Sequence, residues 1–232
     1  MGYENFIPED IRALYEIHDY RHAAAILYTE FREEFDEIME ALRNFKISYQ
    51  NIIDKGGSES QIPKNLSQLL RPDPKNPRWV EGQLQAELSV NGDKVSVRSH
   101  KVDYLKGRVA LDLEWNSKDQ TYDRDLNAFS SFYIYNRISV GVLITRSNDL
   151  DPLFKELGIK KKYGASTTQM GKLIPRLNAG VNGGCPVLVF GITPKIIEGN
   201  KPTPQEIAEA NAKIKKQIET EVEDQLDEEE KE

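Results

Sequence analysis

Three carboxylates in one short stretch are the residues best suited to chemistry: Asp103, Asp112 and Glu114. Apolar residues alternate along 108–115, and this period of two predicts a strand. Asp112 and Glu114 stand two apart on it, so both side chains point to the same face and share a small volume. Clustered carboxylates repel one another unless a proton or a hard cation separates them, and Mg²⁺ prefers oxygen ligands. We therefore expect a magnesium site, which Asp103 joins if it lies at the end of the preceding strand.

The same acids also fit a plain edge strand with a solvated acidic face. Against this interpretation, the opposite face of the strand is apolar, as in a core strand, with Val109, Leu111, Leu113 and Trp115. Metal-dependent cleavage of phosphodiesters needs such a layout, because carboxylates hold a divalent ion while another group orients or deprotonates water. The pattern therefore favours a nuclease-like site.

Four segments, in order, resemble the BglII/BstYI-type restriction endonucleases, which are type II enzymes of the PD-(D/E)xK nuclease fold. They are VDYLKGRVALDLEWN (102–116), the helix and strand of 123–146, GASTT (164–168) and GGCPVLVFG (183–191). The resemblance covers residues 66–195. It implies an α/β fold in which a mixed central β-sheet is sandwiched by helices.

The resemblance assigns catalytic and metal-binding roles to the three carboxylates. Asp103 matches the first acid of the family motif, and Asp112 stands where glutamate is more usual. Glu114 occupies the third position, where lysine is commonest in the superfamily. A glutamate there leaves two roles open, acceptor of a proton from water or ligand of a second metal ion.

The resemblance also indicates which residues approach DNA. Two of them directly follow the carboxylate strand, and a second reading loop within 163–169 is small and polar, as a base-reading loop should be. A lysine on the following helix is expected on phosphate. The predicted DNA contacts are Asn116, Ser117, Lys118, Ser166, Thr167, Thr168 and Lys172.

These features predict a type II restriction endonuclease that cuts both strands of a short palindrome in double-stranded DNA with Mg²⁺. Two-fold symmetric DNA is most simply read by a homodimer. By resemblance, the helix at 123–136 is a candidate for its interface. Two alternatives stay open: a nonspecific or repair nuclease of the same fold, and a catalytically silent DNA-binding or interaction protein.

The net charge of −7 is unusual for a DNA-binding protein. Residues 203–232 hold eleven acidic residues and four lysines, which accounts for all of it. The rest of the chain is neutral, so a local basic face is compatible with the acidic tail. Basic clusters bind phosphate, although a lysine triplet alone fits an ordinary solvated loop. The candidate face comprises Lys160, Lys161, Lys162, Lys172 and Arg176.

Composition fits a cytoplasmic enzyme without membrane contact. Cys185 is the only cysteine, so an intrachain disulfide is excluded and a reducing compartment is expected. The N-terminus lacks a signal-peptide pattern, and apolar runs fall well short of the roughly 20 residues that a membrane span requires. At 232 residues the chain is long enough for one sizeable core.

The elements are expected in a mixed order. A helical N-terminal region, with apolar residues at helical spacing between 26 and 42, precedes a hairpin formed by strands at 84–90 and 94–98. Strands at 138–145 and 186–192 and helices at 123–136, 151–157 and 168–177 follow. We expect an endonuclease domain over 1–200 and an acidic tail over 201–232 that is partly helical or disordered.

Other chemistries fit the sequence less well. His18 and His22 stand four apart on an expected helix, but the glutamate of a zinc-protease motif is missing, which favours an ordinary surface pair. The glycines at 164 and 171 are too far apart for a phosphate loop, and Leu173 replaces its Ser or Thr. The chain also lacks a Gly-x-Ser-x-Gly motif.

Overall fold

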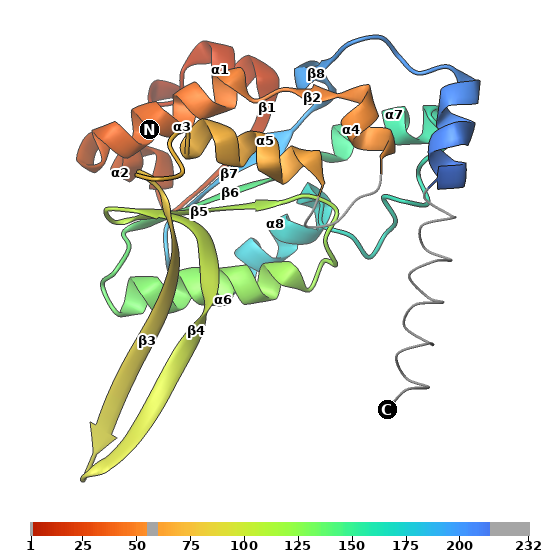
Figure 1. Cartoon of the computed structure of the whole chain (residues 1–232). Coiled ribbons are helices and arrows are strands. Elements are labelled where there is room, and N and C mark those ends of the chain that lie inside the picture. Colours follow the sequence, from red (N-terminus) through yellow and green to blue (C-terminus); the bar gives the residue numbers. More distant parts are fainter. Residues whose placement is uncertain (1, 55–59, 214–232) are drawn as a thin grey trace, which may run out of the picture.

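A six-stranded mixed sheet separates two helical layers (Figure 1). The computed structural model describes residues 2–54 and 60–213. Across the sheet the strands are ordered β1 (Tyr15–Tyr20), β7 (Val187–Ile192), β6 (Val140–Arg146), β5 (Val109–Glu114), β4 (Asp93–Lys106) and β3 (Val80–Val90). The neighbours β5, β6 and β7 are parallel, and the other pairs are antiparallel. A separate parallel pair joins β2 (Ile47–Ser48) and β8 (Ile197–Glu198).

The helices divide between the two faces of the sheet (Figure 1). One layer contains α1 (Glu9–Leu14), α2 (Ala23–Glu30), α3 (Arg32–Asn44), α4 (Tyr49–Ile53), α5 (Gln61–Leu70) and α7 (Asp151–Glu156). The other contains α6 (Thr121–Ile134) and α8 (Met170–Asn178). Each layer has its own hydrophobic core against the sheet. The predicted α/β class, with a mixed sheet between helices, is confirmed.

The predicted hairpin is present and longer than expected. Asn91 and Gly92 have φ angles of 53° and 94°, the positive values that a tight two-residue hairpin turn requires. Its second strand, β4, continues to Lys106 and carries Asp103 three residues from its end. Gly107, with φ of 52°, then turns the chain into the carboxylate strand.

The N-terminal region, predicted to be helical, also contains a strand. Residues Tyr15–Tyr20 form an edge strand whose backbone pairs with β7, a long-range partner that local periodicity does not reveal. His18 therefore lies in a strand, where its Nε2 is 2.8 Å from Glu16 Oε1. His22 precedes α2 with φ of 59°. The expectation that both histidines share a helix is wrong. The run at 26–42 is also split, at Phe31, into α2 and α3.

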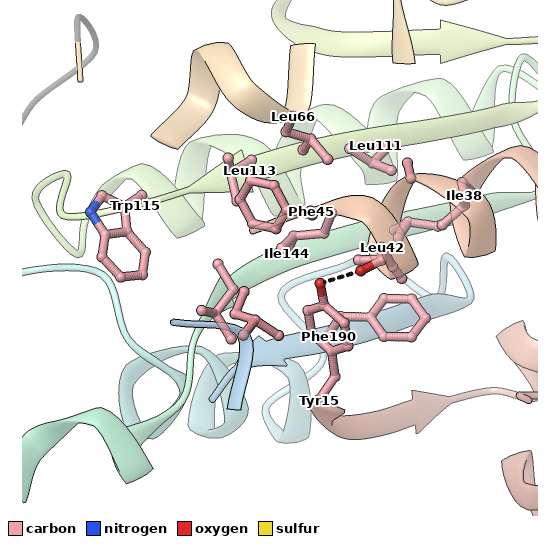
Figure 2. Packing of buried hydrophobic residues seen from close by; sticks show 14 of the residues in the cluster. Tyr15, Ile38, Leu42, Phe45, Leu66, Leu111, Leu113, Trp115, Ile144 and Phe190 are labelled. Atoms are coloured by element: carbon pink, nitrogen blue, oxygen red, sulfur yellow. Dashed lines mark hydrogen bonds between the residues drawn. The ribbon is translucent and has the colours of Figure 1, made fainter. Parts of the chain in front are cut away.

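The apolar face of β5 packs on the helical layer that contains α3 and α5. Figure 2 shows Leu111 and Leu113 of β5 near Phe45 and Leu66, with Trp115 farther along at the end of the strand. All five side chains are buried. The other face of β5 turns toward α6, where Ala110 belongs to the second core. Because β5 also lies between β4 and β6, all four of its sides are occupied by protein. This fixes the strand, and with it the carboxylates that it carries.

The end of the described chain is helical over 204–213. Ile207 packs against the first core and Ala210 is buried beside it. The rest of the expected acidic tail, residues 214–232, lies outside the described residues, and the division at residue 200 stays a prediction. In the described part of the chain, every helix is too short or too polar to cross a membrane.

A close approach between β6 and α6 gives a stability test. A Cβ placed on Gly141 would lie 2.5 Å from the Phe129 ring, so Gly141→Ala forces that ring to move. We expect a loss of about 1–3 kcal/mol in the free energy of unfolding, the usual cost of overpacking, measured by urea denaturation. The double variant Gly141→Ala/Phe129→Leu should recover part of the loss. An undiminished loss in the double variant would contradict the clash.

Candidate active site

Strand pairing sets Asp103 beside Asp112. Tyr104 pairs with Leu111 in the antiparallel ladder of β4 and β5, and continuing this register by one residue brings the two aspartates opposite each other. The backbone N–H of Asp103 donates a hydrogen bond to Asp112 Oδ1 over 2.6 Å. The predicted neighbourhood of these two acids is therefore present.

The acids on β5 lie inside the protein. Asp112 is 3% exposed and Glu114 7%, whereas Asp103 is exposed to solvent. The alternative of a solvated edge strand is wrong, because β5 is a central strand and α6 covers its acidic face. The three carboxylates thus differ in exposure: Asp112 and Glu114 are buried, and solvent reaches Asp103.

Asp112 has a carboxyl oxygen, Oδ2, that is buried and accepts no hydrogen bond from the described residues. Burial, followed by repulsion from Asp103, raises the pKa of Asp112 well above its ordinary value. Burial and the Glu114 charge raise the pKa of Asp103 as well, although its side chain keeps contact with water. A bound cation would relieve all of these strains, so the residues fit a metal ion.

The carboxylates do not form a closed cage. Within residues 2–54 and 60–213, no group of three or more His, Cys, Asp or Glu side chains is arranged to hold a metal ion. The support for a cation therefore comes from the orphaned oxygen and the mutual repulsion of the acids.

Glu114 is held from several sides at the start of α6. The Thr121 hydroxyl lies 3.1 Å from Glu114 Oε2, and the Thr145 hydroxyl donates to the Glu114 backbone carbonyl over 3.0 Å. Helix N-termini carry partial positive charge, which favours a carboxylate there. Arg124 Nη2 lies 3.9 Å from Glu114 Oε1 with its side chain partly in solvent. Glu114 therefore has a fixed position at the rim of the buried acids.

Asp125 is a fourth acid that the sequence reasoning missed. It comes from α6 and is 3% exposed, and its Oδ2 is buried without a partner among the described residues. Burial, then repulsion from Glu114 and Asp112, raises its pKa to about 9. A signal was present, because Tyr122, Leu126 and Phe129 mark the inner face of this helix at the same spacing. An acid on an apolar stripe is a candidate functional group.

Arg71 is a second residue that was missed. Its guanidinium donates hydrogen bonds to the carbonyls of Asp103 and Trp79 and lies 4.4 Å from the centre of the Tyr104 ring. It thereby holds the backbone at Asp103. Sequence patterns offer little signal for such a contact, because Arg71 follows α5, far from the strand that it supports.

The two predicted DNA-reading segments lie side by side. The backbone N–H of Thr168 donates to the Ser117 carbonyl over 2.9 Å, and that of Asp119 donates to the Ser166 carbonyl over 2.9 Å. Between these bonds, Lys118 and Thr167 form an isolated antiparallel β-bridge. Segments 116–119 and 164–168 thus form one surface at the end of the carboxylate strand. Asn116 adopts φ of 60°, which the left-handed region permits for asparagine.

The expectation that Thr168 contacts DNA is wrong. This residue is fully buried, and its hydroxyl accepts a hydrogen bond from Ser117 N at 3.2 Å. In this structure the residue joins the two segments and cannot touch a base. Ser166 and Lys118 are exposed, whereas Asn116, Ser117 and Thr167 are half-buried. Those five remain candidates for DNA contact.

The expected basic face is broken up. Lys160 pairs with Asp151 at 2.5 Å, and Arg176 pairs with Asp123 at 2.8 Å. Lys162 turns inward to donate to the Ile52 carbonyl, and burial lowers its pKa to about 8. Lys172 stays half-exposed, with Nζ 4.0 Å from Asp119. A lysine triplet in sequence does not ensure a patch in space.

The arrangement of a mixed sheet between helical layers is consistent with the restriction-endonuclease-like fold. The sequence model of the family described as restriction endonuclease BglII/BglIII matches residues 15–192. The chain therefore belongs to this family of nucleases, as the resemblance predicted. The match runs from β1 to β7 and includes the carboxylates and both reading segments. A search of curated proteins found no match.

The raised pKa of Asp125 predicts how stability depends on pH. Between its ordinary value of 3.8 and about 9, the folded state binds a proton that the unfolded state releases. The free energy of unfolding of the metal-free protein should therefore fall as pH rises through that window. Asp125→Asn removes this dependence, so its advantage in Tm should be larger at pH 8 than at pH 5, measured in chelator.

The exposed Asp149 provides the control, since Asp149→Asn should shift Tm equally at the two pH values. A pH-independent difference between the Asp125→Asn variant and the unchanged protein would contradict a strongly perturbed buried acid.

Proposed function

We propose that this protein is a type II site-specific deoxyribonuclease, a homodimer that makes double-strand cuts at a short palindrome with Mg²⁺. One observation carries the proposal: buried carboxylates with an orphaned oxygen on β5 stand next to two paired polar segments. A catalytic centre and a base-reading surface would thereby be joined by one strand. Membership of a restriction endonuclease family supports the same conclusion.

In the proposed mechanism the protein binds the scissile phosphate over the three carboxylates. Asp103 and Asp112 would hold Mg²⁺, which when bound lowers the pKa of its water and stabilises charge on the phosphate oxygens. Glu114 orients the attacking water or accepts its proton as the new phosphorus–oxygen bond forms and one ester bond breaks. Arg124 stands beside Glu114 with a charge complementary to phosphate. Asp125 borders this group from α6.

The sequence reading also gives DNA contacts and a dimer surface. Asn116, Ser117, Lys118, Ser166 and Thr167 would face the bases, with Lys172 on phosphate. For the dimer, exposed apolar side chains gather where α6 ends, namely Tyr133, Ile134 and Tyr135. Gly183 approaches Ser130 of the same helix, and Val181 nearby is also exposed. Such a patch suits an isologous contact between two copies.

Digestion of supercoiled plasmid DNA with Mg²⁺ tests this function against its alternatives. Discrete bands would support the site-specific enzyme. A smear would indicate a nonspecific or repair nuclease, and intact plasmid would indicate a silent DNA-binding protein. Sequencing the ends of the bands gives the recognition site.

The carboxylates should be needed for cutting and not for binding. We expect Asp103→Asn, Asp112→Asn and Glu114→Gln each to slow cleavage by at least about a hundredfold, the scale of losing a principal transition-state contact. Binding of the specific duplex, measured by fluorescence anisotropy in Ca²⁺, should change little or tighten, because repulsion from phosphate is removed. The control Glu30→Gln, at an exposed position in α2, should cut normally. Normal cutting by Asp112→Asn would place the active site elsewhere.

Reading residues and phosphate-binding residues should behave differently. Asn116→Ala and Ser166→Ala should relax sequence preference, because each lost base-edge contact costs about 1–3 kcal/mol of discrimination. Lys172→Ala should weaken binding to every sequence and flatten its salt dependence. Affinities for specific and randomised duplexes across a salt series separate the two effects. If both alanine variants kept full preference, these segments would not read DNA.

A further inference from the structure

Arg146 is a buried arginine that the proposed mechanism leaves without a role. It is the last residue of β6 and its exposed fraction is 0%. The guanidinium lies 5.2 Å from the centre of the Tyr163 ring and 5.6 Å from that of Phe154. Burial lowers its pKa, and among the described residues it forms no ion pair. A buried charge without a direct counterion does not by itself stabilise the fold. The role of Arg146 is therefore sought in the groups to which its guanidinium donates hydrogen bonds.

The guanidinium holds the second reading segment at two points. Nε donates to the Thr168 carbonyl over 2.6 Å, and Nη2 donates to the Thr167 hydroxyl over 2.5 Å. The Thr167 hydroxyl in turn donates to the Gly164 carbonyl over 2.8 Å. These bonds fix the backbone and one side chain of segment 164–168 from below. A planar fork suits this task, because its donors have a fixed geometry.

The same two threonines connect to the carboxylate strand. The Thr168 N–H donates to the Ser117 carbonyl, and the Thr168 hydroxyl accepts from the Ser117 N–H. Thr167 forms a β-bridge with Lys118. One residue before Arg146, the Thr145 hydroxyl donates to the Glu114 carbonyl. Because that proton is used, Tyr122 of α6 is the donor in its 2.6 Å contact with Thr145. The end of β6 therefore contacts both the reading segments and the catalytic strand.

We propose that Arg146 is a positioning residue for sequence discrimination, which keeps segments 116–119 and 164–168 in register with each other and with the carboxylates. The inference rests on the proposed function. The residue does not touch DNA, since it is fully buried. It acts through Thr167 and Thr168, so that both reading segments face a duplex as one rigid surface.

Two variants and a matched control test the proposal. Arg146→Met removes the fork and keeps an unbranched apolar stem, whereas Arg146→Lys keeps the charge with a single nitrogen. The control is Tyr15→Phe, which deletes a buried hydrogen bond of 2.7 Å from the Tyr15 hydroxyl on β1 to the Leu42 carbonyl on α3 (Figure 2). Discrimination is the ratio of cleavage rates for the preferred site and for its single-base-pair variants.

We expect Arg146→Met to reduce that ratio by at least about tenfold, the scale of one lost base contact, with nonspecific binding changed less than about twofold. Arg146→Lys should not restore it, and Tyr15→Phe should leave it intact at equal loss of Tm. Full discrimination by the Arg146→Met variant, or full rescue by lysine, would overturn the inference and leave the proposed function standing. If the unchanged protein itself fails to discriminate, both are wrong.

Hydrogen exchange supplies a readout that needs no DNA. In Arg146→Met the amides of Thr168 and Asp119, which cross between the two segments, should exchange at least about tenfold faster, since their opening no longer breaks the fork contacts. Tyr15→Phe should not change them relative to the rest of the sheet. If Arg146→Met fails to fold, Thr167→Val removes one acceptor from the other side and must give the same acceleration. Unchanged exchange in a folded variant would overturn the proposal.

Discussion

The burial of Asp112 and Glu114 on a central strand is the constraint on which the rest of the structure depends. A strand covered on both faces and both edges ordinarily carries only apolar side chains. Here one face packs on the N-terminal helical layer through Leu111, Leu113 and Trp115, and this anchors the strand against the repulsion among its acids. The opposite face is left for charge. Because charged groups taken out of water interact more strongly, the buried acids would attract a cation strongly.

The second feature of the site is its compactness along the chain. The proposed catalytic and reading groups lie on and directly after β5, since Asn116 and Ser117 begin two residues after Glu114. The parallel neighbour β6 ends beside them, and its last two residues, Thr145 and Arg146, hold the Glu114 carbonyl and the second reading segment. A displacement of the reading segments would therefore change the positions of the carboxylates, because short chains of hydrogen bonds connect the two. Such an arrangement suits an enzyme in which recognition must precede cutting.

Local patterns predicted the hairpin, the carboxylate strand and the helix α6, because alternation, Asn-Gly turns and helical periodicity are properties of neighbouring residues. The strand β1 was not predicted, since its partner β7 lies far along the chain and Tyr15–Tyr20 sits among helical signals. The same limit applies to charges. The triplet at Lys160 was expected to form a face, yet Asp151 and the Ile52 carbonyl engage two of its members. Partners distant in sequence decide such outcomes, whereas the acid at Asp125 carried a readable signal that was overlooked.

The groups without partners are concentrated where function is proposed. Among the described residues, six buried side-chain polar atoms lack a hydrogen bond, and four of them are Asp112 Oδ2, Asn116 Oδ1, Asp125 Oδ2 and Arg146 Nη1. The other two are Ser60 Oγ and Asp151 Oδ1. Each of these costs stability, because desolvation is not compensated. The first four atoms gather at the ends of β5 and β6 and on the side of α6 that faces them. Selection for ligand binding would produce such a cluster, whereas selection for stability alone would remove it. The two apolar cores, one on each side of the sheet, offset the stability that these unpartnered groups cost. The fold can therefore keep them in place.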